Sequence, residues 1–160
     1  RLDRGVSYAF HAAAPPGEWI NDPNALAFRD GRYQLFVQHA ADAPAFRRIG
    51  WGRLSSADLM TWRWDGVTLP PAEDGYRYSG SLARDRLFFT DHRPSGPWQR
   101  QRQAMLDADA AGARIAPDPF GPEGRNMRDP FVWRTAHGWR MLVACPCDWT
   151  TWRTDPPSTL

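Results

Sequence analysis

Short strand-like segments that alternate with turn signals constrain the fold of this chain more than any other feature of its sequence. Residues 24–28 are largely apolar, residues 33–39 are rich in aromatic and β-branched side chains, and an Asp-Gly turn lies between them at residues 29–32. Two such runs joined through Asp-Gly are the strongest short-range signal for a β-hairpin. We therefore predict an antiparallel hairpin near the start of the chain.

The same alternation continues along the sequence, and no segment has the pattern of an amphipathic helix of about 11 or more residues. The further strands that we predict lie at residues 49–55, 59–64, 79–83, 87–90, 129–134 and 139–144. The predicted loops lie at residues 40–48, 70–75 and 107–122, and a turn at residues 136–138 joins the last two strands in a hairpin. Many short strands separated by turns indicate an all-β sandwich, barrel or propeller.

Composition narrows the function without naming it. The 160 residues correspond to about one domain, and a net charge of +2 argues against a dedicated binder of nucleic acid or another polyanion. No apolar run approaches the ~18 residues of a membrane helix. Nine Trp residues indicate a β-rich core, a sugar-stacking surface, or both.

The cysteines give no sign of a metal site. Cys145 and Cys147 are the only two, and neither a C-x-x-C motif nor a Cys/His set with zinc spacing accompanies them. We expect two buried thiols, no metal and no cofactor. The chain begins at Arg1 without a signal-type apolar stretch, which slightly favours the cytoplasm over secretion while leaving the compartment and the oligomeric state open.

Two segments place a carboxylate directly before a proline and next to an apolar run. They are residues 19–24, with the sequence W-I-N-D-P-N, and residues 128–130, with the sequence R-D-P. Each has a purely structural interpretation, in which Asp22 caps a turn and Asp129 forms a local ion pair. Pro also sets the geometry of a strand's start, so both carboxylates could face one pocket, as glycoside hydrolysis requires.

These segments belong to a longer series that resembles glycoside hydrolase family 32, the invertases, levanases, inulinases and sucrose-6-phosphate hydrolases. Residues 19–24 resemble its W-M-N-D-P-N-G signature, and residues 33–38 its Y-H-L-F-Y-Q strand. Its W-G-H…S-x-D-L-x-x-W, F-S-G-S and R-D-P motifs are matched in order at residues 51–62, 78–81 and 128–130. Five motifs in the family's order make the resemblance specific.

The resemblance implies an all-β fold, a five-bladed β-propeller, of which residues 1–160 form the N-terminal portion and about the first half of the blades. In such a family Asp22 matches the nucleophile, and Asp129 matches the carboxylate that stabilises the transition state. The positions that match the fructosyl-binding residues are Trp19, Asn21, Gln38, Trp51, Tyr78, Ser79 and Arg128. We expect Trp19 and Trp51 to line the pocket, and Trp62 and Trp133 to lie in the core.

The sequence departs from the family in several places. Ala25 stands where Gly is usual, Ile20 where Met is frequent and Arg53 where His is frequent. The general acid/base, a Glu in an E-C-P motif well after R-D-P, has no counterpart. The three Glu residues all precede Asp129, and the A-C-P at residues 144–146 follows Asp129 too closely to be that motif.

Two functions remain after this comparison. The first is a β-fructofuranosidase that removes terminal fructosyl units from sucrose or fructans by a retaining double displacement, with a small-molecule or oligosaccharide fructoside as its partner. The alternative is a truncated, inactive remnant or a weak sugar-binding fragment. A propeller glycosidase acting on arabinosides or xylosides is a more distant possibility, which residues 19–24 and 78–81 disfavour.

Overall fold

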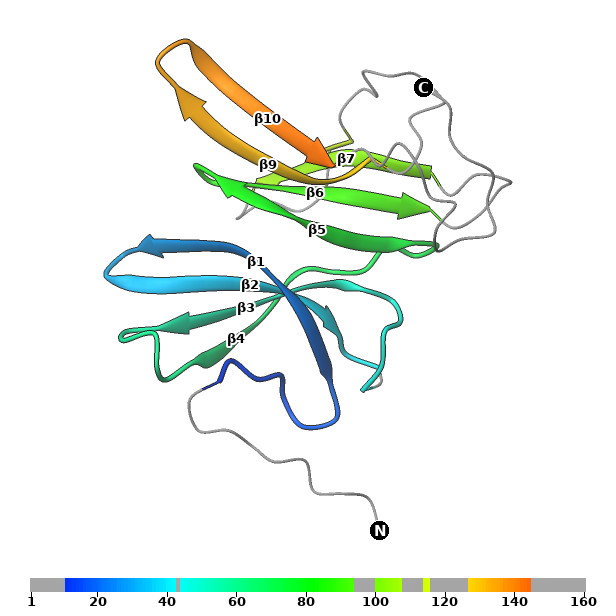
Figure 1. Ribbon diagram of the computed structural model, residues 1–160. Helices are drawn as coiled ribbons and strands as arrows, with labels where there is room; N and C mark the ends of the chain where they lie inside the picture. The colour runs from blue at the N-terminus through cyan, green and yellow to red at the C-terminus, as the bar shows by residue number, and fades with distance from the viewer. Residues whose placement is uncertain (1–10, 43, 94–99, 108–113, 116–126, 145–160) are drawn as a thin grey trace.

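The computed structural model describes residues 11–42, 44–93, 100–107, 114–115 and 127–144. Within these ranges the chain forms only β-strands and their connections (Figure 1). The described ranges therefore hold no helix that could cross a membrane. The expectation of an all-β fold is confirmed.

The first sheet contains four consecutive antiparallel strands in the order of the chain. These strands are β1 (Trp19–Arg29), β2 (Arg32–Ala40), β3 (Gly50–Ser56) and β4 (Arg63–Leu69). The predicted hairpin joins β1 to β2 through Asp30 and Gly31, with φ angles of 51° and 74°. Positive φ at both central residues is the geometry that suits a two-residue hairpin turn.

The second sheet repeats this order, and a hairpin follows it. The sheet consists of β5 (Tyr76–Ala83), β6 (Arg86–Arg93), β7 (Arg100–Asp107) and β8 (Arg114–Ile115). The hairpin pairs β9 (Arg128–Thr135) with β10 (Gly138–Ala144). In Figure 1, β5 faces the first sheet and the hairpin lies on the other side of the second sheet.

Two strand predictions need correction. The strand expected at residues 59–64 is mostly a turn, because Ser56 Oγ and Asp58 Oδ1 accept hydrogen bonds from the backbone N–H groups of residues 58–61. Such local side-chain bonds compete with strand pairing, so β4 begins only at Arg63. Strand β7 was not expected, since its Arg- and Gln-rich sequence lacks a strand signal. Most of residues 107–122, and both cysteines, lie outside the described residues.

The core joins the two sheets. Phe36, Trp51 and Leu69 of the first sheet form one buried cluster with Leu87 and Phe89 of the second. Strand β5 contacts both β1 and β9, so the first strands of the three units lie side by side. This is the arrangement of inner strands in successive blades of a β-propeller.

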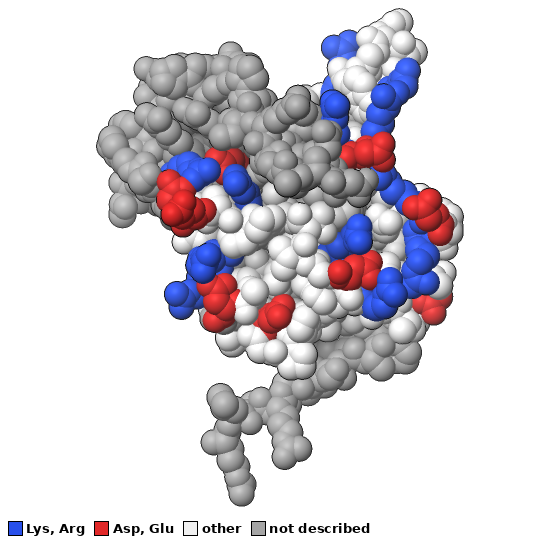
Figure 2. Space-filling view, turned by 180° about the vertical axis from the view of Figure 1, so that it is seen from behind, with Lys and Arg blue, Asp and Glu red and all other residues white. Residues whose placement is uncertain are grey.

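Charged residues are mixed on the surface. Figure 2 shows basic and acidic residues intermingled over the coloured part of the face seen from behind. The described residues form several ion pairs, including Arg29 with Asp85 and Arg63 with Asp65. This mixture matches the low net charge of the sequence.

Candidate active site

Each of the three inner strands carries a β-bulge at a residue that the sequence motifs single out. In β1, the two residues Asn21 and Asp22 lie opposite a single residue of β2, Gln38. In β5, Ser79 is the extra residue between Tyr78 and Gly80. Bulges re-aim side chains and occur frequently beside active sites.

The third bulge lies in β9. Asp129 and Pro130 stand between positions paired with Ala144 and Leu142, so two residues of β9 are matched by one of β10. Asp129 has a φ of 60°, a left-handed conformation that costs a non-glycine residue free energy and recurs at functional sites. The three bulges therefore place Asp22, Ser79 and Asp129 at corresponding irregular points of neighbouring strands.

A chain of hydrogen bonds joins the first two bulges. Gln38 Nε2 donates to Ser79 Oγ over 2.8 Å, and Ser79 Oγ donates to Asp22 Oδ2 over 2.6 Å. Gln38 is buried whereas Asp22 is exposed. The buried amide thus orients the hydroxyl group toward the carboxylate, which receives a charge-assisted hydrogen bond.

The bulge of β9 is held by the second sheet. The backbone N–H of Asp129 donates to Thr90 Oγ1 over 3.0 Å. Ser81 Oγ donates to the Pro130 carbonyl over 2.8 Å and accepts from the Val132 N–H over 3.0 Å. Two buried hydroxyl groups of β5 and β6 therefore fix the unusual backbone on both sides of Asp129.

The two carboxylates influence each other. Partial burial raises the pKa of Asp129, the adjacent Arg128 opposes this effect, and the negative charge of Asp22 raises the pKa further. Asp22 and Asp129 are thus near enough to interact electrostatically. Their opening into one common pocket remains a prediction.

Trp51 does not lie where the motif comparison places it. Its side chain is 0% exposed, and its indole Nε1 donates to the backbone carbonyls of Arg77 and Tyr78, each over 3.2 Å. A fully buried side chain cannot line a substrate pocket. The expectation that Trp51 contacts the sugar is therefore wrong for this structure.

The two tryptophans expected in the core are also placed differently. Trp133 is exposed because it lies on the outward face of β9, where Pro130 and Val132 alternate with it and take the buried positions. Trp62 is half-buried in the 57–62 turn, and its indole donates to the Leu59 carbonyl over 3.2 Å. Neither residue belongs to the cluster that joins the two sheets.

Trp19 belongs to a row of aromatic residues that the sequence reasoning did not identify. Its ring lies 5.5 Å from that of Phe46, which lies 5.9 Å from Tyr76 and 6.1 Å from Tyr78. Tyr78 in turn stacks on His92 at 4.6 Å. Phe46 projects from the β2–β3 connection and is half exposed. The sequence feature that could have identified it is an aromatic residue standing alone in a loop of mostly small and polar residues.

No metal site accompanies this arrangement in the described part of the chain, which contains no group of three or more His, Cys, Asp or Glu side chains suited to a cation. The remaining candidates, Asn21 and Arg128, lie beside Asp22 and Asp129 in β1 and β9. The chemical content of the site is thus a pair of carboxylates on bulged strands, with hydroxyl, amide, guanidinium and aromatic groups nearby.

Comparison with known proteins identifies the family. The model of the glycosyl hydrolases family 32 N-terminal domain matches residues 11–152. The chain belongs to this family. Its family 32 relatives include a raffinose invertase of Escherichia coli, 30% identical over 155 residues, and a sucrose-6-phosphate hydrolase of Escherichia coli, 31% identical over 153 residues. These alignments cover 85% and 84% of this chain, and 32% and 31% of the relatives.

Solved structures agree with the family 32 fold. An exo-inulinase from Aspergillus awamori superimposes with a TM-score of 0.62 at 24% identity, over 84% of this chain and 34% of the inulinase. A fructan 1-exohydrolase IIa from Cichorium intybus has a TM-score of 0.61 at 25% identity, over 89% and 30% of the two chains. The chain thus spans about a third of the length of the curated relatives that it matches, and the family and propeller fold expected from the motifs are confirmed.

Proposed function

We propose that this chain supplies the nucleophile and the second carboxylate of a β-fructofuranosidase-type glycoside hydrolase that releases terminal fructosyl units from sucrose or fructans. The observation that carries the proposal is the meeting of the β1 and β5 bulges, where Ser79 donates to Asp22, close to the charge of Asp129. The relatives named raffinose invertase and sucrose-6-phosphate hydrolase support a fructosyl substrate.

Asp22 is the proposed nucleophile. Its free carboxylate oxygen attacks the anomeric carbon of the fructosyl unit while the bond to the leaving oxygen breaks and that oxygen takes up a proton. The resulting fructosyl ester is then hydrolysed by water, and the two inversions give net retention. The hydrogen bond from Ser79 to Oδ2 keeps one carboxylate oxygen occupied, so that Oδ1 is the oxygen available for attack.

Asp129 is the proposed stabiliser of the oxocarbenium-like transition state. Its carboxylate accepts hydrogen bonds from sugar hydroxyl groups, and its negative charge stabilises the positive charge that develops on the fructosyl ring. Both roles need the ionised form. Because the pKa of Asp129 is raised, activity should decline on acidification at a higher pH than an ordinary aspartate would allow.

The sugar contacts proposed for this site come from the surrounding polar and aromatic groups. Gln38 is buried, and its Oε1 has no hydrogen-bond partner among the described residues; its proposed part in the site is to orient Ser79 through Nε2. Asn21 and Arg128 offer donors, while Trp19, Tyr78 and Ser79 complete the proposed fructosyl site. Trp51 is left out of this set because it is fully buried.

The proton donor to the leaving group is proposed to come from outside the described residues. Glu18 is committed elsewhere, because its Oε2 lies 2.5 Å from Nε2 of the buried His39. Glu73 is exposed in the connection between β4 and β5. Within the described residues, neither glutamate forms a hydrogen bond or ion pair with Asp22 or Asp129.

The test is hydrolysis of sucrose and inulin by the natural protein that contains these residues, with methanol added to report stereochemistry. Retention predicts methyl β-fructofuranoside as the product. We expect Asp22→Asn to lower kcat by about 10⁴-fold or more. Asp30→Asn is the matched control, because Asp30 is an exposed hairpin-turn residue and Asn tolerates its positive φ.

Two outcomes would contradict the proposal. One is hydrolysis that survives Asp22→Asn at the wild-type rate. The other is an inverted methyl fructoside, which would require water or methanol to attack directly rather than through an ester with Asp22.

A further inference from the structure

We propose that Trp51 is a positioning residue, which fixes the bulge of β5 and thereby holds Ser79 against Asp22. The consequence for catalysis rests on the function proposed above, whereas the mechanical role of Trp51 does not. The motif comparison would make Trp51 a substrate contact, and the structure assigns it a different task.

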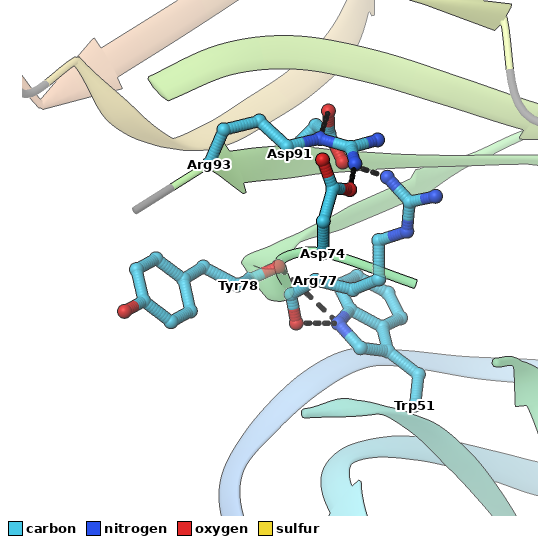
Figure 3. Close-up of polar contacts among 6 residues, drawn as sticks. All are labelled: Trp51, Asp74, Arg77, Tyr78, Asp91 and Arg93. Carbon is cyan, nitrogen blue, oxygen red and sulfur yellow. Dashed lines mark hydrogen bonds and ion pairs between the residues drawn. The ribbon is translucent and has the colours of Figure 1, made fainter. Parts of the chain in front are cut away.

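The indole N–H of Trp51 is hydrogen-bonded to backbone carbonyl groups, so it is not available to a sugar hydroxyl. Indole Nε1–H is a donor only, and here it is shared between the carbonyl oxygens of Arg77 and Tyr78, each at 3.2 Å (Figure 3). The ring itself packs against Phe36 and Phe89, with ring centroids at 6.4 and 6.2 Å. Trp51 thus joins a buried apolar anchor to the two residues that immediately precede the bulge.

Each residue of β5 from 77 to 80 is bonded to the first sheet or to Ile49, which directly precedes β3. Arg77 N–H donates to the Ile49 carbonyl over 2.8 Å, and Gly80 N–H lies 3.4 Å from Asn24 Oδ1. Gln38 donates to Ser79. Gln38 and Trp51 are direct cross-strand partners. Gln38 therefore binds the hydroxyl group of the bulge, while its neighbour Trp51 binds the backbone just before it.

The side chain of Arg77 provides the opposing anchor on the second sheet. It forms an ion pair with the buried Asp91, which also accepts from Arg93 Nε over 2.9 Å. Arg93 pairs in turn with Asp74, and the Arg77 guanidinium lies over the Phe89 ring at 5.3 Å. Figure 3 shows the Arg77 side chain directed toward Asp91, Arg93 and Asp74, and the Trp51 indole directed toward the backbone carbonyls of residues 77 and 78. Residue 77 is therefore clamped between the two sheets.

The second sheet holds the opposite side of the bulge through close contact between β5 and β6. A Cβ atom at Gly80 would collide with the carbonyl of Phe88, so β5 and β6 already lie in close contact there. Deleting the indole donor releases the carbonyl oxygens of Arg77 and Tyr78, the two residues before the bulge, while the contacts with β6 remain. Ser79 Oγ then shifts relative to Asp22, and misplacement of a reacting group by about 1 Å can cost 10²-fold in rate.

The experiment compares Trp51→Phe with Trp62→Phe in the natural protein. Both variants remove one indole that donates to backbone carbonyls, but Trp62 does so in the exposed 57–62 turn, away from the site. We expect Trp51→Phe to lower kcat on sucrose by about 10- to 100-fold with little change in KM. We also expect faster amide hydrogen exchange in residues 76–83, and neither effect in Trp62→Phe.

A second substitution guards against a folding defect. Replacing Trp51 by 3-benzothienylalanine keeps the size and shape of the bicyclic ring and exchanges the N–H donor for sulfur. The same fall in kcat and the same faster exchange in β5 are expected, with thermal unfolding close to that of the wild type.

Unchanged hydrogen exchange in β5 for the benzothienyl protein would overturn the proposal. A rise in KM with kcat unchanged would overturn it as well, because that result indicates a lost substrate contact. If the wild-type protein hydrolyses no fructoside, the proposed function fails, and the exchange of β5 still decides the role of Trp51.

Discussion

Strands β5 and β9 occupy equivalent places in successive units, yet their surroundings differ sharply. β5 belongs to a four-stranded sheet in which Phe89 is 0% exposed, whereas β9 pairs with β10 alone among the described strands, and its Phe131 is 59% exposed. Both strands are bulged at a candidate site residue. In each case the bulge is held mainly by side chains of the preceding sheet: Trp51 and Gln38 for β5, and Ser81 and Thr90 for β9.

The comparison shows that the geometry of each site residue is set between units rather than within its own. Asp129 keeps a left-handed backbone although most residues of its hairpin are exposed. The site can therefore be built progressively, each sheet shaping the inner strand that follows it. The four predictions below test how far this holds.

The largest effect is expected for residues 1–160 in isolation. This polypeptide leaves the apolar face of the hairpin in water and contains no Glu after Asp129. Loss of a general acid costs about 10²- to 10⁴-fold in rate. We expect weak or no hydrolysis of sucrose by residues 1–160 alone. Turnover by residues 1–160 at an ordinary glycosidase rate would show that these residues supply their own acid.

The contrast in burial predicts unequal effects of the same substitution. Phe89→Ala should lower the free energy of unfolding by about 3–5 kcal/mol, the usual cost of deleting a buried aromatic ring. Phe131→Ala, in the exposed face of the hairpin, should change it by about 0.5 kcal/mol or less. Urea denaturation followed by tryptophan fluorescence measures both. Equal losses would mean that the face of Phe131 is buried in solution.

Ser81 provides a direct test of how the second sheet holds β9. Ser81→Ala leaves the buried N–H of Val132 and carbonyl of Pro130 without the bonds that they make to Oγ. An unsatisfied buried polar group costs about 1–3 kcal/mol, so hydrogen exchange in β9 should accelerate by at least about tenfold.

Thr135→Ala is the matched control for Ser81→Ala. Thr135 Oγ1 also donates to a carbonyl, that of Gly138, and accepts from the backbone N–H of His137, but within the turn of the hairpin itself. Its removal should affect only the turn. If Thr135→Ala loosened β9 as much as Ser81→Ala, the hairpin rather than the second sheet would be holding Asp129.

The smallest expected effect is electrostatic. Asp22→Asn removes a negative charge that raises the pKa of Asp129, and should lower that pKa, whereas Arg128→Gln removes the opposing cation and should raise it. Because the folded-state pKa lies above the unfolded one, the contribution of Asp129 to stability is favourable at low pH and is lost as pH rises through the folded value. Carbon-13 NMR titration of the Asp129 carboxyl measures the shifts. If Asp129 titrated identically in the wild type and in Asp22→Asn, the two carboxylates would not interact electrostatically.

Much of the fold could be predicted from local sequence. The Asp-Gly turn at residues 30–31 was identified because few residues adopt positive φ there, and a run rich in aromatic and β-branched residues marked β2. Strand β7 escaped because its residues are polar, and the start of β4 was misplaced because hydrogen bonds from Ser56 and Asp58 favoured a turn. The motifs around Asp22 and Asp129 indicated the family, which the matching family model confirmed.

The sequence by itself determined the all-β class and the family, and it singled out the two carboxylates proposed as catalytic, because these depend on local residue patterns and their order. Only the tertiary structure decided which aromatic residues face solvent and which hold backbone. Trp51 and Trp133 both lie in strands, and their burial depends on whether a neighbouring sheet covers them. The three bulges also depend on long-range partners, such as Ser79 for Asp22 and Thr90 for Asp129, which are 57 and 39 residues apart in the chain. Contacts at such separations are selected by the packing of one blade against the next, and no local pattern records them.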